Sequence, residues 1–383
     1  MSLHAFCSPT EVIFGVGAHR RLGSVVARLK ATRVLLVVDP ALRDGGICAS
    51  VVGALEGQGV ALAIFSDLAP DPTDLMAAAA ERLARGHGAE AVIAFGGGST
   101  IDVAKAAAIL VANGGAIQQY EGIEKFSVPP LPLIAIPSTA GTGSEVSGSC
   151  VITDTGSGLK MSIRHPALNP ARVAILDPLV LAGLPAHVAM HAGMDAFVHA
   201  FESYVSLGAN PITDTLNLRA MELIGAHIRR FVADRADLEA GEAMLLGSAM
   251  AGMSFGQTGL GNVHCLARFV GAFFHLSHGL SNALCLPHVA EFNRPAAKAK
   301  FARVAMALGE DVDAGDPDAA KRAVDAIRRL CEDLGVPRRL RDAGVAQERF
   351  DEIADLCVEA DYNRWNPRRT SRSDFKSLLE LAF

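Results

Sequence analysis

The chain has 383 residues, 50% of them hydrophobic and 20% charged, with a formal net charge of −6. This length exceeds what one hydrophobic core usually supports, so two domains are expected. The acidic balance offers no basic surface for nucleic acid. No apolar run reaches the roughly 18 residues that a membrane span needs, and the N-terminal stretch lacks the pattern of a secretory signal. Seven scattered cysteines, none in a CxxC pair, fit reduced thiols. We therefore expect a soluble cytoplasmic protein.

The first half alternates short β-rich runs with helical patterns. Strands are predicted within 33–39, 60–68, 90–96 and 132–139, and helices at 74–88 and 101–113. Such alternation indicates βαβ units and a parallel sheet. Beyond about residue 186 helical patterns dominate, at 187–205, 213–233, 240–256, 298–308, 317–334 and 373–382. The expected fold is a Rossmann-like α/β dinucleotide-binding domain at 1–185, followed by an all-α metal-binding domain at 186–383.

Two loops of the first half follow predicted strands and are rich in glycine or hydroxyl groups. The segment "FGGGSTIDVAK" places three glycines and Ser99 between a strand and a helix. Glycines let the backbone approach a phosphate, and the N–H groups of a helix start attract an anion. The motif is neither GxGxxG nor a Walker loop, so the alternative is a plain turn. The loop "IPSTAGTGSEVS" (136–147) lies where α/β sheets bind ligands, and its alternative is a simple connection.

Asp39 ends the first strong strand, in "VVDP". A carboxylate there accepts hydrogen bonds from the ribose hydroxyls of NAD and repels a 2′-phosphate. The other interpretation is a turn that ends the strand.

Two segments of the second half gather histidines among apolar residues. The first, "HAGMDAFVHAFE", carries His191, Asp195, His199 and Glu202. The second, at 261–288, carries His264, His275, His278 and His288. Residues four apart share one helix face, so the first segment is either a wet face with an acid–histidine pair or part of a metal or catalytic site. Two such segments together favour a metal site. Three imidazoles and one carboxylate, from Asp195, His199, His264 and His278, suit Fe²⁺ or Zn²⁺.

Five motifs resemble, in order and spacing, the iron-containing (group III) alcohol dehydrogenase family. They are "GGGSTIDVAK", "IPSTAGTGSEVS", "LDPLVLAGLP", "GMDAFVHAFES" and "HGLSNALCLPHVAEFN". The resemblance covers nearly the whole chain, as far as "NPR" at 366–368. It implies an N-terminal α/β domain that binds NAD(P), a C-terminal helical domain that holds a divalent metal, and a homodimer or larger homo-oligomer.

The resemblance also assigns roles to individual positions of this sequence. The metal ligands fall on Asp195, His199, His264 and His278, which leaves His191 and Glu202 outside the ligand set and makes His275 and His288 structural. The cofactor-binding set falls on Asp39, Gly96, Gly97, Gly98, Ser99, Asp102, Thr139, Thr142 and Ser144. Lys160 matches a lysine that lines the cleft.

Position 268 departs from the family pattern. Family members commonly carry a second histidine four residues after the His264 position, and this chain has Arg268 there. An arginine stays protonated near neutral pH and cannot shuttle a proton, but it can hold an anion with two hydrogen bonds. Arg268 either binds an anionic group of the substrate or pairs with a carboxylate of the protein, such as Glu202.

The expected reaction is hydride transfer between NAD(H) and a small alcohol, aldehyde or ketone, with Fe²⁺ or alternatively Zn²⁺ as the Lewis acid. Lys160 and Arg268 are the candidate catalytic residues. One alternative is a metal- and NAD-dependent lyase or cyclase like dehydroquinate synthase, against which the sparse basic residues argue. Another is a reductase like maleylacetate reductase, although those enzymes tend to lack the aspartate that this chain keeps as Asp195. A third is a metal-binding protein without catalysis.

Overall fold

The structure, a computed structural model, describes residues 3–313 and 315–383. These residues divide into two compact units. One unit is Cys7–Leu184, and the other is Pro185–Phe383 together with the N-terminal residues up to Phe6. Among the described residues, no helix combines the length and the apolarity that crossing a membrane requires.

The N-terminal unit is built on a six-stranded sheet in the order β1-β9-β6-β4-β2-β3. Its strands are β1 (Glu11–Phe14), β2 (Arg33–Val38), β3 (Ala61–Phe65), β4 (Ala91–Gly96), β6 (Leu133–Pro137) and β9 (Val173–Leu176). Every pair of neighbouring strands is parallel, so the predicted parallel sheet is confirmed. The chain runs outward from β2 to the edge strand β3 and then returns to β4 on the other side of β2. The strand order therefore reverses between β2 and β4.

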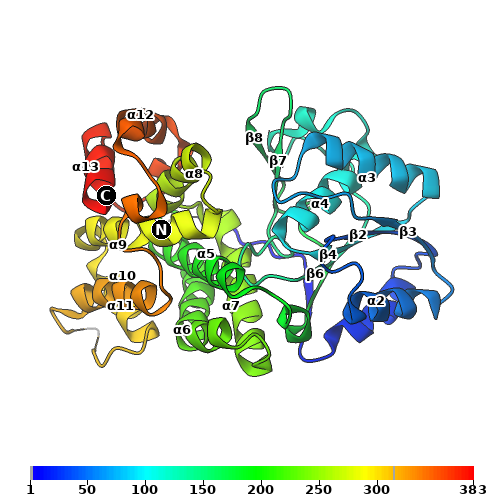
Figure 1. The fold of residues 1–383 in the computed structure, drawn as a ribbon, viewed down its shortest axis with the longest axis horizontal. Coiled ribbons are helices and arrows are strands. Elements are labelled where there is room, and N and C mark those ends of the chain that lie inside the picture. The colour runs from blue at the N-terminus through cyan, green and yellow to red at the C-terminus, as the bar shows by residue number, and fades with distance from the viewer. Residues whose placement is uncertain (1–2, 314) are drawn as a thin grey trace. The chain divides into compact units, whose positions relative to one another are not determined.

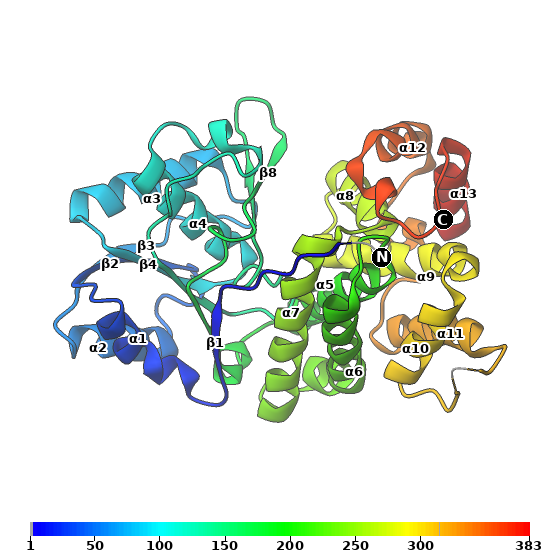
Figure 2. The ribbon, with the colours of Figure 1, turned by 180° about the vertical axis from the view of Figure 1, so that it is seen from behind.

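Helices cover both faces of this sheet (Figures 1 and 2). Helices α1 (Leu22–Arg28) and α2 (Gly46–Glu56) lie on one face, and α3 (Asp74–His87) and α4 (Gly98–Asn113) lie on the other. In β2, Val34, Leu36 and Val38 join the core under α1 and α2, whereas Leu35 and Val37 join the core under α3 and α4. A strand buried on both faces explains why the sequence "VLLVV" is apolar without alternation.

A smaller sheet in the order β5-β8-β7 completes the unit. Its strands are β5 (Gly122–Ile123), β7 (Ser149–Thr153) and β8 (Lys160–Arg164), and β7 and β8 pair antiparallel. Cys150, Ile152, Met161 and Ile163 point into a core shared with α3 and α4. The sequence did not predict this hairpin, because each strand is short and buries only alternate side chains.

In the described part of the C-terminal unit, all the regular secondary structure is helical, as predicted. Its helices are α5 (Ala186–Val205), α6 (Pro211–Ala233), α7 (Leu238–Thr258), α8 (Asn262–Phe274), α9 (His278–Asn293), α10 (Lys298–Ala307), α11 (Ala319–Asp333), α12 (Phe350–Glu359) and α13 (Arg372–Ala382). Helix α5 packs against α6, α7 and α9. Its residues from Gly193 to Val205 are all buried, so the interpretation of this helix as a wet face is wrong.

Candidate active site

Three strand ends of the N-terminal unit bring the predicted cofactor residues to one edge of the large sheet. Asp39 follows β2, the glycine loop follows β4, and the loop at 138–148 follows β6. Strand β4 pairs with both β2 and β6, so the three carboxyl ends are neighbours. In open α/β sheets, ligands bind at this edge where the strand order reverses. In this sheet the order reverses between β2, which leads to Asp39, and β4, which leads to Gly97.

The glycine loop opens directly into α4. Gly97 is the N-cap residue, with an extended backbone and no capping side chain, so the first N–H groups of α4 lack an intrahelical acceptor and attract an anion. A Cβ atom at Gly98 would lie 2.7 Å from Thr142 Cγ2, and one at Gly97 would lie 3.5 Å from Thr139 Cγ2. Because position 98 is glycine, the glycine loop packs closely against the loop at 138–148. In the sequence, only the family resemblance connected these two loops.

Asp102 and Ser144 form a link inside this region. Ser144 Oγ donates to Asp102 Oδ1 at 2.6 Å, and the backbone N–H of Val151 donates to Asp102 Oδ2 at 2.9 Å. Burial raises the pKa of Asp102, although Lys105 and these hydrogen bonds oppose the rise. Both carboxylate oxygens therefore already have protein partners, and Asp102 braces the loop at 138–148 against β7.

The other candidate residues of this unit lie around the glycine loop. Ser99 Oγ donates to the carbonyl oxygen of Pro70. Lys160 Nζ donates to Asp71 Oδ1 at 2.8 Å, and both side chains are exposed. The segment at 70–71 thus connects Lys160 to the loop. Asp39 Oδ1 accepts the backbone N–H of Ala41 at 2.9 Å. This hydrogen bond forms the turn that was the alternative interpretation of Asp39, and it occupies one of the two carboxylate oxygens.

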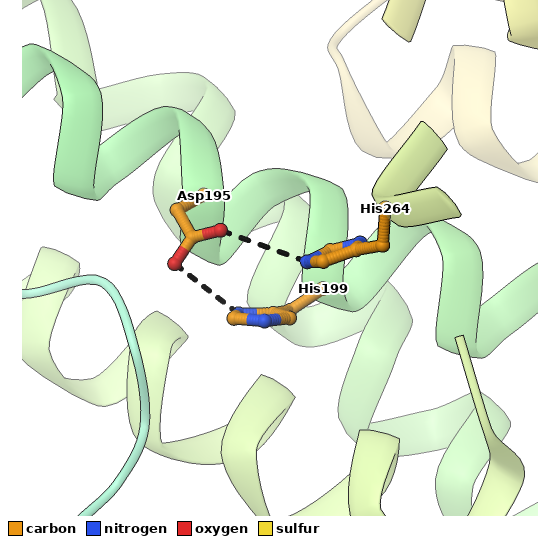
Figure 3. Close-up of side chains that lie close together, drawn as sticks. All are labelled: Asp195, His199 and His264. Atoms are coloured by element: carbon orange, nitrogen blue, oxygen red, sulfur yellow. Dashed lines mark ion pairs between the residues drawn. The ribbon is translucent and has the colours of Figure 1, made fainter. Parts of the chain in front are cut away.

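In the C-terminal unit, the histidine-rich segments converge on one carboxylate (Figure 3). Asp195 and His199 come from α5, and His264 comes from α8. His199 Nδ1 lies 3.8 Å from Asp195 Oδ2, and His264 Nε2 lies 3.6 Å from Asp195 Oδ1. One ligand atom from each of the three residues lies within 4.8 Å of the other two, and all three residues are buried.

His278 approaches the same carboxylate from the first turn of α9. Its Nε2 lies 3.5 Å from Asp195 Oδ1, and 53% of its side chain is exposed. The residue after it, Gly279, packs against the backbone of His191 on α5, where a Cβ atom would collide with the His191 carbonyl oxygen. This close approach brings the start of α9 opposite Asp195.

Two further polar side chains complete the cluster, and sequence reasoning found neither role. Glu202 Oε2 lies 2.7 Å from His264 Nδ1. Asn282 Nδ2 donates to Asp195 Oδ1 at 2.7 Å and lies 3.3 Å from Nε2 of both His264 and His278. Asn282 lies one helical turn after His278 in "HGLSNALCLPH". This spacing is the only feature of the sequence that indicates a role for Asn282.

This arrangement fits a divalent metal ion. The ring nitrogens of His264 and His278 converge with an oxygen of Asp195 around Asn282, whose Oδ1 is buried without a hydrogen-bond partner among the described residues. Burial raises the pKa of Asp195, but the facing histidines outweigh it and hold that pKa below its usual range. Burial lowers the pKa of His264, but Asp195 and Glu202 raise it to about 9. Positive charge is thus stabilised where the donor atoms meet, and donors of this kind suit Fe²⁺ or Zn²⁺.

Arg268 lies one turn beyond His264 on α8 and is exposed. Its guanidinium group lies beside the Tyr362 hydroxyl, where burial raises the pKa of the tyrosine and Arg268 lowers it. No ion pair between described residues includes Arg268, and Glu202 is engaged with His264 instead. The alternative in which Arg268 pairs with Glu202 is therefore wrong.

Comparison with known families accounts for both units. Residues 9–178 match the model of iron-containing alcohol dehydrogenase, and residues 189–383 match the model of the C-terminal part of the Fe-containing alcohol dehydrogenase family. The chain belongs to the iron-containing alcohol dehydrogenase family. The resemblance inferred from five motifs is thus confirmed, and the chain is an oxidoreductase of this family.

Relatives match this family member along its whole length. A NAD-dependent methanol dehydrogenase of Bacillus methanolicus is 35% identical, over 98% of this chain and 99% of the relative. A sulfoacetaldehyde reductase of Bilophila wadsworthia is 37% identical, over 97% of each chain. The solved structure of a 1,3-propanediol oxidoreductase superposes with a TM-score of 0.95 at 35% identity and covers 100% of both chains. None of these names favours the lyase or the non-catalytic alternative.

Proposed function

We propose that the protein interconverts a small alcohol and its aldehyde or ketone, with NAD(H) as hydride carrier and Fe²⁺, or alternatively Zn²⁺, as bound metal. The main support for the proposal is that three imidazoles and one carboxylate converge in the C-terminal unit. The same chain has, near Asp39, the start of helix α4 without a capping side chain. We assign cofactor binding to residues 1–185 and metal and substrate binding to residues 186–383. The family resemblance also supports a cytoplasmic homodimer or larger homo-oligomer.

The N-terminal unit would hold the cofactor. The N–H groups at the start of α4, at Gly98 and Ser99, bind the pyrophosphate. Asp39 accepts hydrogen bonds from the ribose hydroxyls and repels a 2′-phosphate. Thr139 and Thr142 line the nicotinamide side. Lys160 adds a positive charge near the glycine loop. NAD(H) supplies the hydride acceptor or donor.

The C-terminal unit would hold the metal and the substrate. The four ligands are Asp195, His199, His264 and His278, and Asn282 keeps one oxygen of Asp195 oriented toward His264 and His278. Bound there, a divalent ion supplies a Lewis acid that lowers the pKa of an alcohol. Burial of Asp195, His199 and His264 keeps these three ligands away from competing water.

We further propose that the preferred substrate is a short aldehyde or ketone bearing an anionic group, which Arg268 binds. Arg268 is an exposed residue, makes no ion pair among the described residues and follows the ligand His264 by one turn. The Bilophila relative, a sulfoacetaldehyde reductase, acts on an aldehyde with such a group. Other relatives are named for neutral alcohols, so the proposal depends on position 268 and not on the fold.

Kinetics on matched substrates test this preference. We would compare kcat/KM for succinic semialdehyde and butyraldehyde, with NADH, in the wild type and in Arg268→His. A lost anionic contact is worth roughly 2–5 kcal/mol, so the variant should lose at least about tenfold on the acid and little on butyraldehyde. Arg219→His, which replaces an exposed arginine paired with Glu222, serves as the control. Equal losses on both substrates, or a wild type that prefers butyraldehyde, would overturn the role of Arg268.

A further inference from the structure

Glu202 is a buried carboxylate that the ligand set leaves without a function. It lies on α5, three residues after His199, and is only 2% exposed. Helix α5 thus contributes two ligands, Asp195 and His199, and places the Glu202 carboxylate about one turn further along the helix. A buried ionisable group is costly unless hydrogen bonds satisfy it, so its partners indicate its role.

Among the described residues, the hydrogen bonds of the Glu202 carboxylate go to the first turn of α8. Oε1 accepts the backbone N–H of Val263 at 2.6 Å. Oε2 lies 2.7 Å from His264 Nδ1 and accepts the backbone N–H of His264 at 3.3 Å. One carboxylate therefore caps the start of α8, where an anion is favoured by the helix dipole, and contacts the side chain of the ligand that this turn carries.

The contact with the imidazole determines which of its nitrogens is available to a metal. A carboxylate oxygen is an acceptor only, so Nδ1 must carry the proton that it donates to Glu202. In the neutral imidazole, which is the form that binds a metal, the other nitrogen, Nε2, then presents its lone pair. Nε2 is the atom that faces Asp195 Oδ1 at 3.6 Å and Asn282 Nδ2 at 3.3 Å, which is the point where the ligand atoms converge.

We propose that Glu202 is a positioning residue of the metal centre: it fixes the tautomer and the ring orientation of His264 and anchors the helix that carries it. The inference rests on the metal role in the proposed function, but it predicts metal affinity and not turnover. A role as a helix cap alone would predict a different outcome, because capping affects the stability of α8 and leaves the affinity of the folded protein unchanged.

Glu202→Gln separates these two roles. The glutamine carbonyl oxygen can still accept the Val263 N–H, but its amide group would face His264 Nδ1 as a donor and favour the tautomer with the proton on Nε2. We expect metal affinity to fall by roughly 10- to 100-fold, as for other partners of ligand histidines. The measurement is the dissociation constant for Zn²⁺ and Co²⁺, by competition with a chromogenic chelator. His264→Ala gives the value for a lost ligand, and Glu222→Gln, an exposed acid of the same unit, gives the value for an irrelevant change.

A second readout uses the wild type and does not depend on the folding of a variant. In the zinc-loaded protein, NMR of the imidazole should show a His264 Nδ1 proton that exchanges slowly with water, and this signal should be lost in Glu202→Gln. A folded Glu202→Gln protein that binds zinc as tightly as the wild type would overturn the proposal, as would a rapidly exchanging Nδ1 proton in the wild type. A wild type that binds neither metal would instead overturn the metal centre itself.

Discussion

His264 and His278 offer the same donor atom from very different surroundings. The side chain of His264 is 4% exposed and that of His278 is 53% exposed. His264 is also held by a buried carboxylate, Glu202. Both residues should therefore contribute to metal binding, but they should contribute unequally to stability.

Alanine at each position tests this difference. His264→Ala and His278→Ala should both lower metal content and reduce kcat steeply. Only His264→Ala removes the side-chain partner of a buried carboxylate and leaves Glu202 with backbone N–H partners alone. Loss of a hydrogen bond to a charged group costs about 1.5–3 kcal/mol, so the metal-free form of this variant should unfold at a clearly lower urea concentration. Urea titration of the two metal-free variants gives the comparison. Equal midpoints, or full activity of a metal-stripped His278→Ala protein, would contradict this assignment.

Asp39 tests the cofactor side. Its carboxylate should repel a 2′-phosphate, so the wild type should have a higher kcat/KM with NADH than with NADPH. Asp39→Gly should raise the relative efficiency with NADPH by at least about tenfold, because the substitution removes the repelling carboxylate. Arg43, four residues further along, keeps a positive charge in the same turn segment, where its guanidinium donates to Ser66 Oγ at 2.8 Å. Steady-state kinetics with both cofactors measure this ratio. A wild type that prefers NADPH would refute the role of Asp39.

At the scale of elements, the start of α9 depends on its close approach to α5. Gly279→Ala would push a methyl group into the His191 carbonyl oxygen, so α9 must shift and carry His278 away from Asp195. We expect a loss of about 1–3 kcal/mol in stability together with weaker zinc binding. Gly256→Ala, on the exposed face of α7 with nothing within 4 Å of the added Cβ, should instead be neutral or stabilising by up to about 1 kcal/mol. Denaturation and zinc titration of both variants would show the contrast, and unchanged zinc affinity in Gly279→Ala would contradict it.

The sequence predicted elements best where their patterns were long. The strand "RVLLVV" and the helix at 187–205 coincide closely with β2 and α5. The β7–β8 hairpin was not predicted, because alternate residues such as Val151 are exposed and the strands are short.

The same limit holds within the site. The spacing of Asp195 and His199 follows from helical periodicity, so a sequence pattern can indicate it. The contacts of Glu202 with His264, and of Asn282 with Asp195, join different helices. No local pattern encodes them, because they depend on how α5, α8 and α9 pack.

At the scale of the whole molecule, the two halves of the proposed chemistry belong to different compact units. All four candidate metal ligands lie within Pro185–Phe383, and the glycine loop with Asp39 lies within Cys7–Leu184. The proposed reaction requires both the cofactor site and the metal site. A cofactor-binding domain alone, or a metal-binding domain alone, would not consume NADH in a metal-dependent way.

The most direct test is therefore NADH oxidation by one protein sample in two states. The protein would be stripped of metal with a chelator, divided, and one half reloaded with Fe²⁺ under anaerobic conditions, with a parallel reload using Zn²⁺. With a short aldehyde as substrate, we predict net consumption of NADH by the reloaded enzyme, little by the stripped enzyme and little by reloaded His278→Ala. Turnover by the stripped enzyme at the full rate, or no NADH consumption after reloading with either metal, would contradict the central claim.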